Sequence, residues 1–501
     1  MVKNKKEGES MMKMTRFMRL LIGMLAAVML MGCLLTSCRN DPKPNTDNGG
    51  TSTEDDTTPE PEVDRFDALR NLNYSGEEFN VFTYQHTAWI QYFEAVEGGA
   101  QILNEATFDR NGVVEELFDI QIFIEPSADY AKVIEEFSLK ALSGGSEIPD
   151  LVVPWATEPI TSLLVGGYLT DVRTLDYMTL DADYYNQSVN QNFTFFGKQY
   201  AFVSDYTYPL QQRFAFLANT DIINEYRVLE NLETDADSIY KLVSNGEWTW
   251  ENLSLMIKDI YNDNGTTEDI KDDLYGLTTS YAHAAYVMNN WGDGINLVKP
   301  TDNGFTYSLY DLNMQDKFDD LCDLVKTSDV YLVDTLDFSH FKNSRAMFAT
   351  YSSDPWSLTG ETWQTLHFAY LPYPKYQAED DYITTTHGGL MFIPAGAKDV
   401  EMAGAVSEAL AISSNIYIYD AYISNYMEGR VIQVPEGVEM YDIMRETAFY
   451  GFTRYVDPSN LVKHYTYFQT PLKNNTALST HYETNGGSIQ RAFNALALML
   501  Q

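Results

Sequence analysis

The spacing of apolar residues changes along the chain in a way that predicts strands alternating with helices. Short runs rich in β-branched and aromatic residues predict three strands, at 78–84, 120–125 and 150–153. Apolar residues at helical spacing predict helices between them, at 102–118 and 130–141, and Ser143-Gly144-Gly145 predicts where the second helix stops. Strands that alternate with helices favour right-handed crossovers and a mainly parallel sheet. The predicted fold class is therefore α/β.

The pattern continues toward the end of the chain, although frequent Tyr and Asp make it less regular. It predicts further strands at 197–203, 214–218, 348–351, 368–371 and 390–393. Further helices are predicted at 251–261, 400–412 and 440–448. Trp248 and Trp250 stand at a helix start, away from any strand end, which favours a role in the core. Cys322 is interpreted as a small buried apolar residue.

The N-terminal segment has its own pattern, a basic stretch followed by an apolar run. Residues 13–19 carry the basic charges, and 20–35 are apolar or small. A membrane-spanning helix usually needs about 20 apolar residues, so a secretory signal is favoured. The sequence Leu35-Thr36-Ser37-Cys38 resembles the lipobox of bacterial lipoproteins, which implies a signal peptide at 1–37 and a lipid on Cys38. An ordinary cleaved signal and an N-terminal anchor helix are the alternatives, and the polar residues after Cys38 argue against both.

Composition and charge narrow the range of partners. Residues 38–64 hold almost no large apolar side chain, so a lipidated cysteine and a disordered acidic tether reaching roughly 30 Å are predicted there. The formal net charge is −39, and removal of residues 1–37, whose net charge is +4, makes it about −43. Such an acidic surface repels nucleic acid and anionic lipid headgroups. We therefore expect no nucleic-acid partner.

Motifs that would indicate a cofactor or a metal are missing from the sequence. It has no H-E-x-x-H, no G-x-S-x-G, no P-loop and no dinucleotide-binding glycine pattern. Two of the three cysteines lie in the N-terminal segment, so only Cys322 remains and no intrachain disulfide is expected. The run 262–265 suggests a calcium loop, but Ile260 and Lys271 stand where oxygen ligands are needed. No cofactor and no metal site are predicted, while a glycosidase-type carboxylate pair stays open.

Short motifs follow one another in a characteristic order over nearly the whole chain after Cys38. They are PDLVV at 149–153, GYLTD at 167–171, GKQYA at 197–201, FAFLANTD at 214–221, GEWTW at 246–250, YGL at 275–277, RAMF at 345–348 and LPYPK at 371–375. In this order, behind a lipobox and an acidic tether, the chain resembles the extracellular solute-binding proteins of sugar-type ABC importers. That broad family includes the maltose-binding protein. One departure is Asn219-Thr220, which stands where the family has asparagine–lysine and leaves the subfamily open.

The resemblance implies a two-lobed fold of the periplasmic-binding-protein type, with a hinge and a ligand cleft between the lobes. It places the first α/β lobe at 65–212 plus 387–422. The second α/β lobe is placed at 213–386 plus 423–501. Because such a chain crosses between the lobes more than once, closure is expected to be a hinge motion about a few residues.

Candidate ligand residues stand in the loops after predicted strands, because ligands of open α/β sheets sit beyond the carboxyl ends of strands. A sugar presents an apolar ring face and a rim of hydroxyls, which suits aromatic side chains together with Asp, Asn, Gln or Glu. A glycine there lets the backbone approach the ligand. Ordinary packing is the alternative for each residue, since the chain has 35 tyrosines. The candidates are Tyr84, Gln85, Trp155, Asp205, Tyr206, Trp291, Tyr351, Asp354, Trp356 and Gly388.

Three functions fit this reasoning. The first is a receptor, expected to be a monomer, that is lipid-anchored on the extracellular side of the cell membrane. It captures a carbohydrate, such as an oligosaccharide, and delivers it to ABC permease subunits without any chemistry. The second keeps the importer but carries a cation such as a polyamine, held by aromatic and Asp side chains. The third is a surface-anchored glycan-degrading enzyme with two carboxylates across a cleft.

Overall fold

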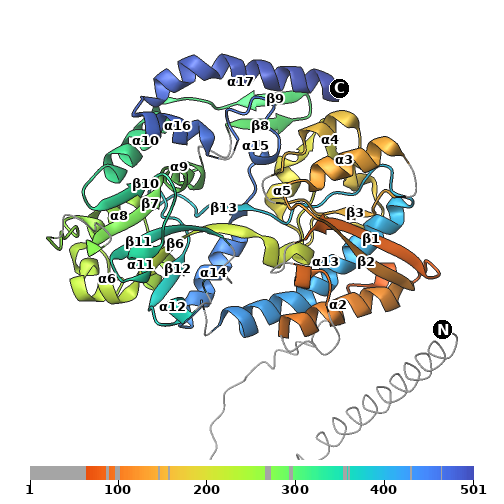
Figure 1. Ribbon diagram of the computed structural model, residues 1–501, viewed down its shortest axis with the longest axis horizontal. Coiled ribbons are helices and arrows are strands. Elements are labelled where there is room, and N and C mark those ends of the chain that lie inside the picture. Colours follow the sequence, from red (N-terminus) through yellow and green to blue (C-terminus); the bar gives the residue numbers. More distant parts are fainter. Residues whose placement is uncertain are drawn as a thin grey trace, which may run out of the picture. The chain divides into compact units, whose positions relative to one another are not determined.

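Two sheets with helices packed on them organise the protein (Figure 1). The computed structural model describes residues 64–85, 90–95, 102–144, 147–155, 158–265, 272–292, 297–353, 358, 361–428, 431–463 and 465–501. The smaller sheet has the strand order β2-β1-β3. The larger sheet has seven strands, in the order β10-β7-β11-β6-β13-β14 with β12 paired to β6. We call the regions built on the smaller and the larger sheet the first and the second lobe.

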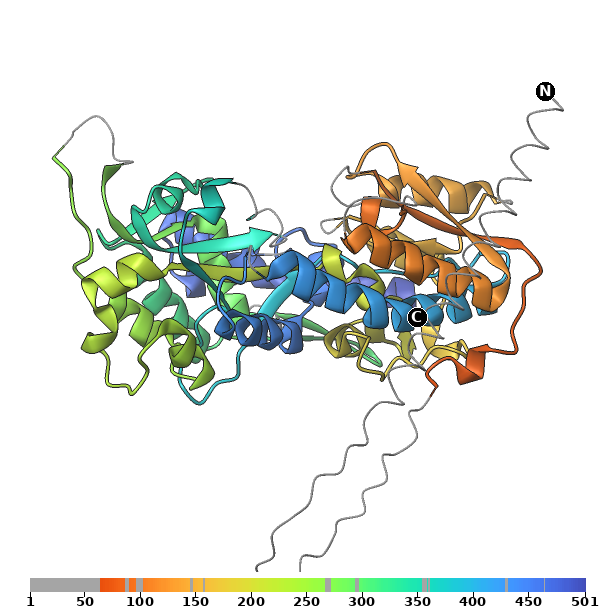
Figure 2. The same cartoon turned by 90° about the horizontal axis from the view of Figure 1, so that it is seen from below.

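The first lobe has the parallel strand–helix–strand order that the sequence predicts. Its strands are β1 (Glu77–Tyr84), β2 (Ile120–Ser127) and β3 (Leu151–Val152), and both neighbours of β1 run parallel to it. Its helices are α2 (Ile102–Phe118), α3 (Val133–Ser143), α4 (Thr161–Gly166) and α5 (Gln187–Asn192), followed by the hairpin of β4 (Thr194–Phe195) and β5 (Lys198–Gln199). Later in the chain, α13 (Val400–Tyr422) returns and packs along α2, as Figure 2 shows.

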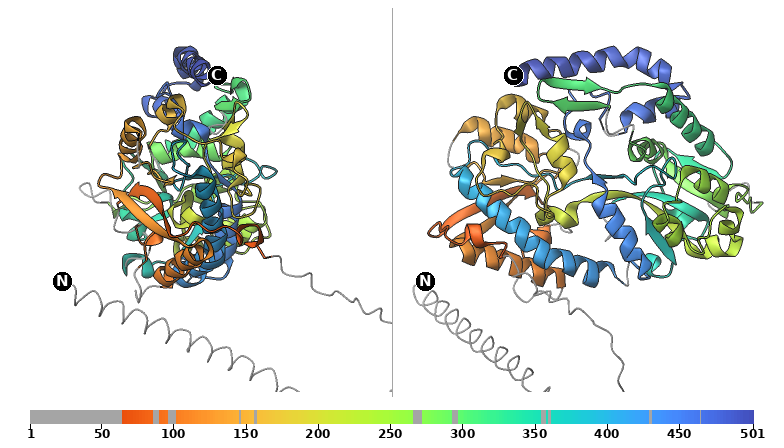
Figure 3. Two further views of the ribbon diagram at one scale, coloured as in Figure 1. Left: turned by 90° about the vertical axis from the view of Figure 1, so that its right-hand side faces the viewer. Right: turned by 180° about the vertical axis from the view of Figure 1, so that it is seen from behind.

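The rest of the described chain contains the larger sheet and the elements around it. Its strands are β6 (Gln212–Asn219), β7 (Tyr275–Ser280), β8 (Val298–Thr301), β9 (Gly304–Tyr307), β10 (Val330–Val333), β11 (Ala346–Ser353), β12 (Phe368–Leu371), β13 (Thr384–His387) and β14 (Ala448–Phe449). Its helices are α6 (Thr220–Tyr226), α7 (Ile239–Ser244), α8 (Trp250–Ile257), α9 (Tyr281–Asn290), α10 (Leu312–Val325), α11 (Ser339–Lys342), α12 (Glu361–Gln364), α14 (Glu436–Glu446), α15 (Phe452–Tyr455), α16 (Thr466–Asn474) and α17 (Leu478–Leu500). The last of these lies beside the β8–β9 hairpin (Figure 3).

Short polar side chains begin several of these helices. Asn219 accepts a hydrogen bond from the backbone N–H of Ile222 at 3.1 Å where α6 starts. Asp399 accepts one from Met402 at 3.0 Å where α13 starts. Each bond satisfies one of the backbone N–H groups that a helix start leaves without a partner, which is typically worth about 1 kcal/mol.

Most of the predicted elements are confirmed, and some differ in extent. The strand predicted at 197–203 is reduced to β5 and a single bridge at Phe202. The strand predicted at 390–393 is wrong in extent, because only single-residue bridges form there, to Val152 and Phe202. Two glycines with positive φ, Gly388 and Gly389, precede it and break the regular extension. The helix predicted from residue 130 begins at Val133, after a turn in which Asp129 accepts from the N–H of Ala131.

Two predictions about single residues concern the core. Trp248 is fully buried and donates from Nε1 to the carbonyl of Pro372 at 2.8 Å, and Trp250 is buried too. The core role expected of both tryptophans is confirmed. Cys322 is half-buried and packs against the core. Within the part of the chain that the structure describes, no helix combines the length and apolar character that a membrane span needs.

Candidate functional site

The chain crosses between the two lobes at β6 and β13, which we call the crossing strands. The carboxyl ends of strands in both lobes point toward these crossings. β11 runs antiparallel to β6, the first strand after the crossing, and Ser353 at its end lies opposite Arg213. Its parallel neighbour β7 therefore ends on the same side. In the first lobe, Phe392 follows the crossing strand β13 and pairs antiparallel with Val152, so β3 also ends toward the crossing. Ligands of α/β sheets bind at such ends. We call this region the interlobe site.

The first-lobe side of the interlobe site carries three aromatic side chains in contact. Tyr84 ends β1 and Trp155 follows β3, and their ring centroids lie 5.2 Å apart in an edge-to-face arrangement. Tyr130 lies 5.8 Å from Trp155, also edge to face, and is 52% exposed. Tyr84 is buried, and Trp155 is half-buried above it. The group offers the apolar surface that a sugar ring needs, with its solvent side at Tyr130 and Trp155.

A buried carboxylate fixes the position of Trp155. Glu158 is 5% exposed and accepts hydrogen bonds from the backbone N–H groups of Trp155 at 3.2 Å and Ile134 at 2.8 Å. The second bond lies in the first turn of α3, where a helix favours negative charge. Burial nevertheless raises the pKa of Glu158 to about 7, against the lowering effect of the two bonds. Glu158 thus connects the tryptophan loop to α3.

The second-lobe side of the interlobe site has a cavity of about 320 Å³, lined by both apolar and polar side chains. His283 lines it near the start of α9, and its Nε2 lies 2.6 Å from Oγ of Ser352 at the end of β11. Burial lowers the pKa of His283 to about 4, so the imidazole is neutral at physiological pH. Ser280 and Tyr351 line the same cavity. The imidazole and these three hydroxyls can exchange hydrogen bonds with sugar hydroxyls. Asp334 also lines the cavity, and its charge is paired with Lys473.

The crossing segments between these two sides are tightly hydrogen-bonded. Gly388 donates its N–H to the Tyr455 hydroxyl at 3.1 Å and accepts from the Tyr450 hydroxyl at 2.9 Å. Beside it, His387 Nε2 lies 2.6 Å from Oε1 of Gln212. Gly388 is buried, with φ of +84°, a conformation that favours glycine. These contacts tie the two crossing strands to α15.

The structure separates three of the sequence candidates from the interlobe site. Trp291 packs against Trp250 and donates from Nε1 to the carbonyl of Pro374, which makes it a core residue of the second lobe. Tyr206 is 1% exposed, with the guanidinium of Arg110 4.7 Å from its ring centroid. The third, Asp205, lines a different cavity. Gln85 is exposed after β1 and donates its backbone N–H to Ser127. Asp354, Trp356 and Cys38 lie outside the described residues.

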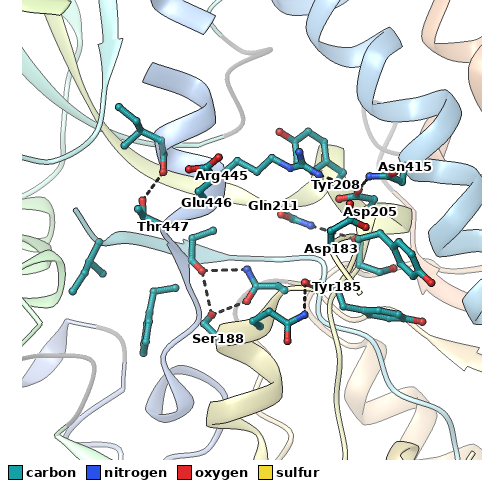
Figure 4. Close-up of a pocket in the computed structure, with 18 of the residues that line it drawn as sticks. Asp183, Tyr185, Ser188, Asp205, Tyr208, Gln211, Asn415, Arg445, Glu446 and Thr447 are labelled. Atoms are coloured by element: carbon teal, nitrogen blue, oxygen red, sulfur yellow. Dashed lines mark hydrogen bonds and ion pairs between the residues drawn. The ribbon is translucent and has the colours of Figure 1, made fainter. Parts of the chain in front are cut away.

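Figure 4 shows the cavity that contains Asp205. The direction of side chains along β6 places it on the face of that strand opposite the interlobe site. Side chains alternate along a strand, and here Gln212 and Phe214 contact His387. Between them, Arg213 turns the opposite way and donates to the Tyr441 hydroxyl of α14 at 3.2 Å. The cavity on that side has a volume of about 970 Å³, and its walls come from 181–188, 204–211, 381–383 and 443–449, with Asn415. We call it the hinge cavity.

Several polar residues of these two regions were missed by reasoning from the sequence. His283 follows β7, a strand that the sequence analysis does not predict, although the β-branched residues in 275–280 are a signal for it. Ser352 and Gln212 stand at ends of predicted strands, but nothing in the sequence marks them as polar partners of a histidine. Arg445 sits on a helix, where a charged residue is ordinary. Among the described residues, no group of His, Cys, Asp and Glu suits a metal ion.

Comparison with solved structures relates this architecture to a known fold. UgpB from Mycobacterium tuberculosis, in complex with glycerophosphocholine, shares 14% sequence identity with a TM-score of 0.52, over 78% of this chain and 95% of that one. A cyclo/maltodextrin-binding protein complexed with maltotetraose shares 12% identity with a TM-score of 0.55, over 84% and 98%. The fold is that of a two-lobed solute-binding protein. No protein-family model and no curated protein matches the sequence.

A third similar structure was solved with a different ligand. The ABC substrate-binding protein Lmo0181 from Listeria monocytogenes, in complex with cycloalternan, shares 13% identity with a TM-score of 0.50, over 83% of this chain and 98% of that one. All three are binding proteins. The two-lobed α/β fold expected from the motif order is therefore confirmed.

Proposed function

We propose that the protein is a receptor that captures a neutral carbohydrate, such as an oligosaccharide, between its lobes. The observation that carries this proposal is the pairing of two unlike surfaces at the strand ends of the interlobe site. The first lobe contributes the aromatic group of Tyr84, Trp155 and Tyr130. The second contributes the cavity around the neutral imidazole of His283 and the hydroxyl of Ser352. An apolar ring face rimmed with hydroxyls is complementary to both.

The role in import is part of the same proposal. The solved structures with this fold include an ABC substrate-binding protein and a cyclo/maltodextrin-binding protein. By analogy of fold, the loaded form would pass its ligand to ABC permease subunits and carry out no chemistry itself. Closure free energy would come from a ligand that contacts both lobes at once. We place the lobe boundaries near residues 212, 387 and 422.

The membrane attachment rests on the N-terminal sequence alone. We propose that residues 1–37 are a signal peptide, that Cys38 carries the lipid, and that the folded part works as a monomer on the extracellular side of the membrane. More than one acyl chain would give stable anchoring where a single chain gives only marginal binding. Mass spectrometry of the membrane-extracted protein tests this, because a Cys38→Ala variant would lose both the acyl mass and the membrane association.

Isothermal titration calorimetry with a panel of neutral oligosaccharides tests the binding function. We expect at least one member to bind with one site per chain, and a Trp155→Ala variant to bind it roughly three- to tenfold more weakly, because a stacking surface is lost. Tyr226→Ala is the matched control, since Tyr226 is an exposed aromatic residue at the end of α6 and should leave affinity unchanged. Absence of heat across the panel, with the protein folded, would count against the proposal. Release of products from a bound glycan would show an enzyme instead.

A further inference from the structure

The hinge cavity has walls from both lobes and a volume far larger than a single polar group needs. Residues 181–188 of the first lobe form one wall, and 381–383 with 443–449 form the other. The first wall is held in place by Glu408 of α13, a 3% exposed carboxylate that accepts from the hydroxyls of Tyr184 at 2.6 Å and Tyr185 at 2.7 Å. The cavity is therefore a formed feature of the fold rather than a gap between loose loops.

A buried carboxylate in this cavity has unused acceptor capacity. Asp205 is 5% exposed, and its Oδ2 accepts from Asn415 Nδ2 at 2.6 Å and from Arg445 at 3.2 Å. No hydrogen bond from the described residues reaches its Oδ1. An ionised carboxylate accepts about four hydrogen bonds. Burial raises the pKa of Asp205, while the charge of Arg445 and the bond from Asn415 oppose that effect. A further donor in the cavity would stabilise the charged form.

Several amide and hydroxyl donors that line the cavity are used within the protein, whereas the buried hydroxyl of Tyr208 has no hydrogen-bond partner among the described residues. The side-chain amide of Gln211 donates to the carbonyl of Ser204, and that of Asn186 donates to the carbonyl of Ala448. The hydroxyl of Thr447 donates to the carbonyl of Ile443. At the rim, three carboxylates accept no hydrogen bond from the described residues: Asp181 on the first wall, and Asp381 and Glu446 on the second. The charged side chains that line the cavity are five carboxylates and a single guanidinium, that of Arg445, which is paired with Asp205. This excess of negative charge favours a cation over an anion.

Aromatic rings in and around the cavity add a preference for cations. The guanidinium carbon of Arg445 lies 4.0 Å from the ring centroid of Tyr419 and 5.5 Å from that of Tyr208, which shows that these rings already hold one positive group. Tyr382 and Phe449 provide further ring surface on the second wall. The methylene groups of an alkylamine could pack on such rings while its ammonium groups reach the carboxylates.

We propose that the hinge cavity binds an organic cation with at least two amino groups, such as a diamine or a short polyamine. One ammonium group donates to Oδ1 of Asp205, and the others lie between the rim carboxylates of the two walls. The separate positions of these carboxylates, on both walls and at the base, favour two or more charges over one. This inference concerns the opposite face of β6 from the interlobe site and does not depend on the carbohydrate proposal.

Calorimetry with three matched probes tests the proposal. The probes are 1,4-diaminobutane, n-butylamine and 1,4-butanediol, which share a four-carbon chain and differ in charge. We expect one diamine site per chain, binding at least threefold weaker for the monoamine, and none for the diol. The variant Glu446→Gln should weaken diamine binding by about two- to fivefold, the range typical of an exposed ion pair. Adding Asp381→Asn should weaken it further by a similar factor.

A second carboxylate on the same helix provides the matched control. Glu439 is exposed on α14 and does not line the cavity, so Glu439→Gln removes the same charge without touching the site. Non-specific attraction of a diamine to a chain of net charge −39 would weaken equally in both variants. Equal effects of Glu446→Gln and Glu439→Gln would overturn the proposal, and so would loss of diamine binding in Trp155→Ala alone. The first outcome would leave the carbohydrate proposal unchanged, whereas the second would place the diamine in the interlobe site and favour a cationic cargo there.

Discussion

At the residue scale, one tryptophan lies in the proposed ligand site and another lies in the core. Trp155 and Trp291 both follow regular elements, and the sequence offers no feature that separates them. The structure leaves Trp155 half-exposed beside Tyr130, whereas Trp291 is closed in by Trp250 and Tyr376. The hydrogen-bond partners that the fold provides determine where each tryptophan lies. Glu158 accepts from the backbone N–H of Trp155, and the carbonyl of Pro374 accepts from the indole N–H of Trp291.

Glu158 gives a prediction about pH and stability. Its pKa of about 7 in the folded state lies above the usual 4.5, so the folded state binds the proton more tightly than the unfolded state. The stability from this preference is fully present below about pH 4.5 and is lost as the pH rises toward 7. We expect the free energy of unfolding to fall by on the order of 1–3 kcal/mol over this range, relative to Glu158→Gln.

Chemical denaturation at several pH values from 4.5 to 8 measures this effect. The Glu158→Gln variant keeps the size of the side chain and removes the titration, so subtraction isolates the contribution of this carboxyl group. Parallel stability curves for the two proteins would show that Glu158 titrates normally and that burial does not control it.

At the element scale, the apolar pattern of the sequence predicts where strands and helices lie along the chain. It predicts less well which of them pack together in the fold. The strands at 368–371 and 78–84 and the helix at 102–118 appear almost as expected, because short β-branched and aromatic runs mark the strands and helical spacing of apolar residues marks the helix. The hinge cavity has no such signal. Its walls come from irregular segments far apart in the chain, so only the completed fold brings Asp205 to Arg445. The alternation along β6 then separates the cavity from the interlobe site.

The glycine after the crossing strand β13 yields a prediction about backbone strain. Gly389 has φ of +72°, and a Cβ there would lie 2.7 Å from Oγ1 of Thr207, the side chain that also donates to the carbonyl of Gly389. Gly389→Ala should lower the free energy of unfolding by about 2–4 kcal/mol, through both the backbone conformation and the close contact. Thermal or denaturant unfolding measures it.

Gly197 separates these two causes. It has nearly the same φ, +71°, and open space around the position of a Cβ. Gly197→Ala should therefore cost only the backbone part, about 1–2 kcal/mol. If Gly389→Ala lost no more unfolding free energy than Gly197→Ala, the close contact with Thr207 would cost nothing. The segment around Thr207 would then be able to move, and the crossing would not be rigid there.

At the scale of the whole molecule, the strand ends of the two lobes point toward each other. The crossing strands between the lobes have two faces, and each face supports a different site. One face supports the interlobe site, with an aromatic group on one side and the cavity around His283 and Ser352 on the other. The opposite face supports the hinge cavity, which is rich in carboxylates. The order of motifs in the sequence predicts this two-lobed arrangement. It does not predict the chemistry of the two faces, because that depends on which side of β6 each residue occupies.

The central claim is that one ligand touches both lobes, and a double-mutant calorimetric measurement tests it most directly. The ligand is the oligosaccharide that binds best in the panel, and the variants are Trp155→Ala in the first lobe, His283→Ala in the second, and both together. We expect each single variant to weaken binding roughly three- to tenfold, since a stacking surface or a hydrogen bond is lost. Loss of affinity in Trp155→Ala with an unchanged dissociation constant in a folded His283→Ala would contradict capture between the lobes.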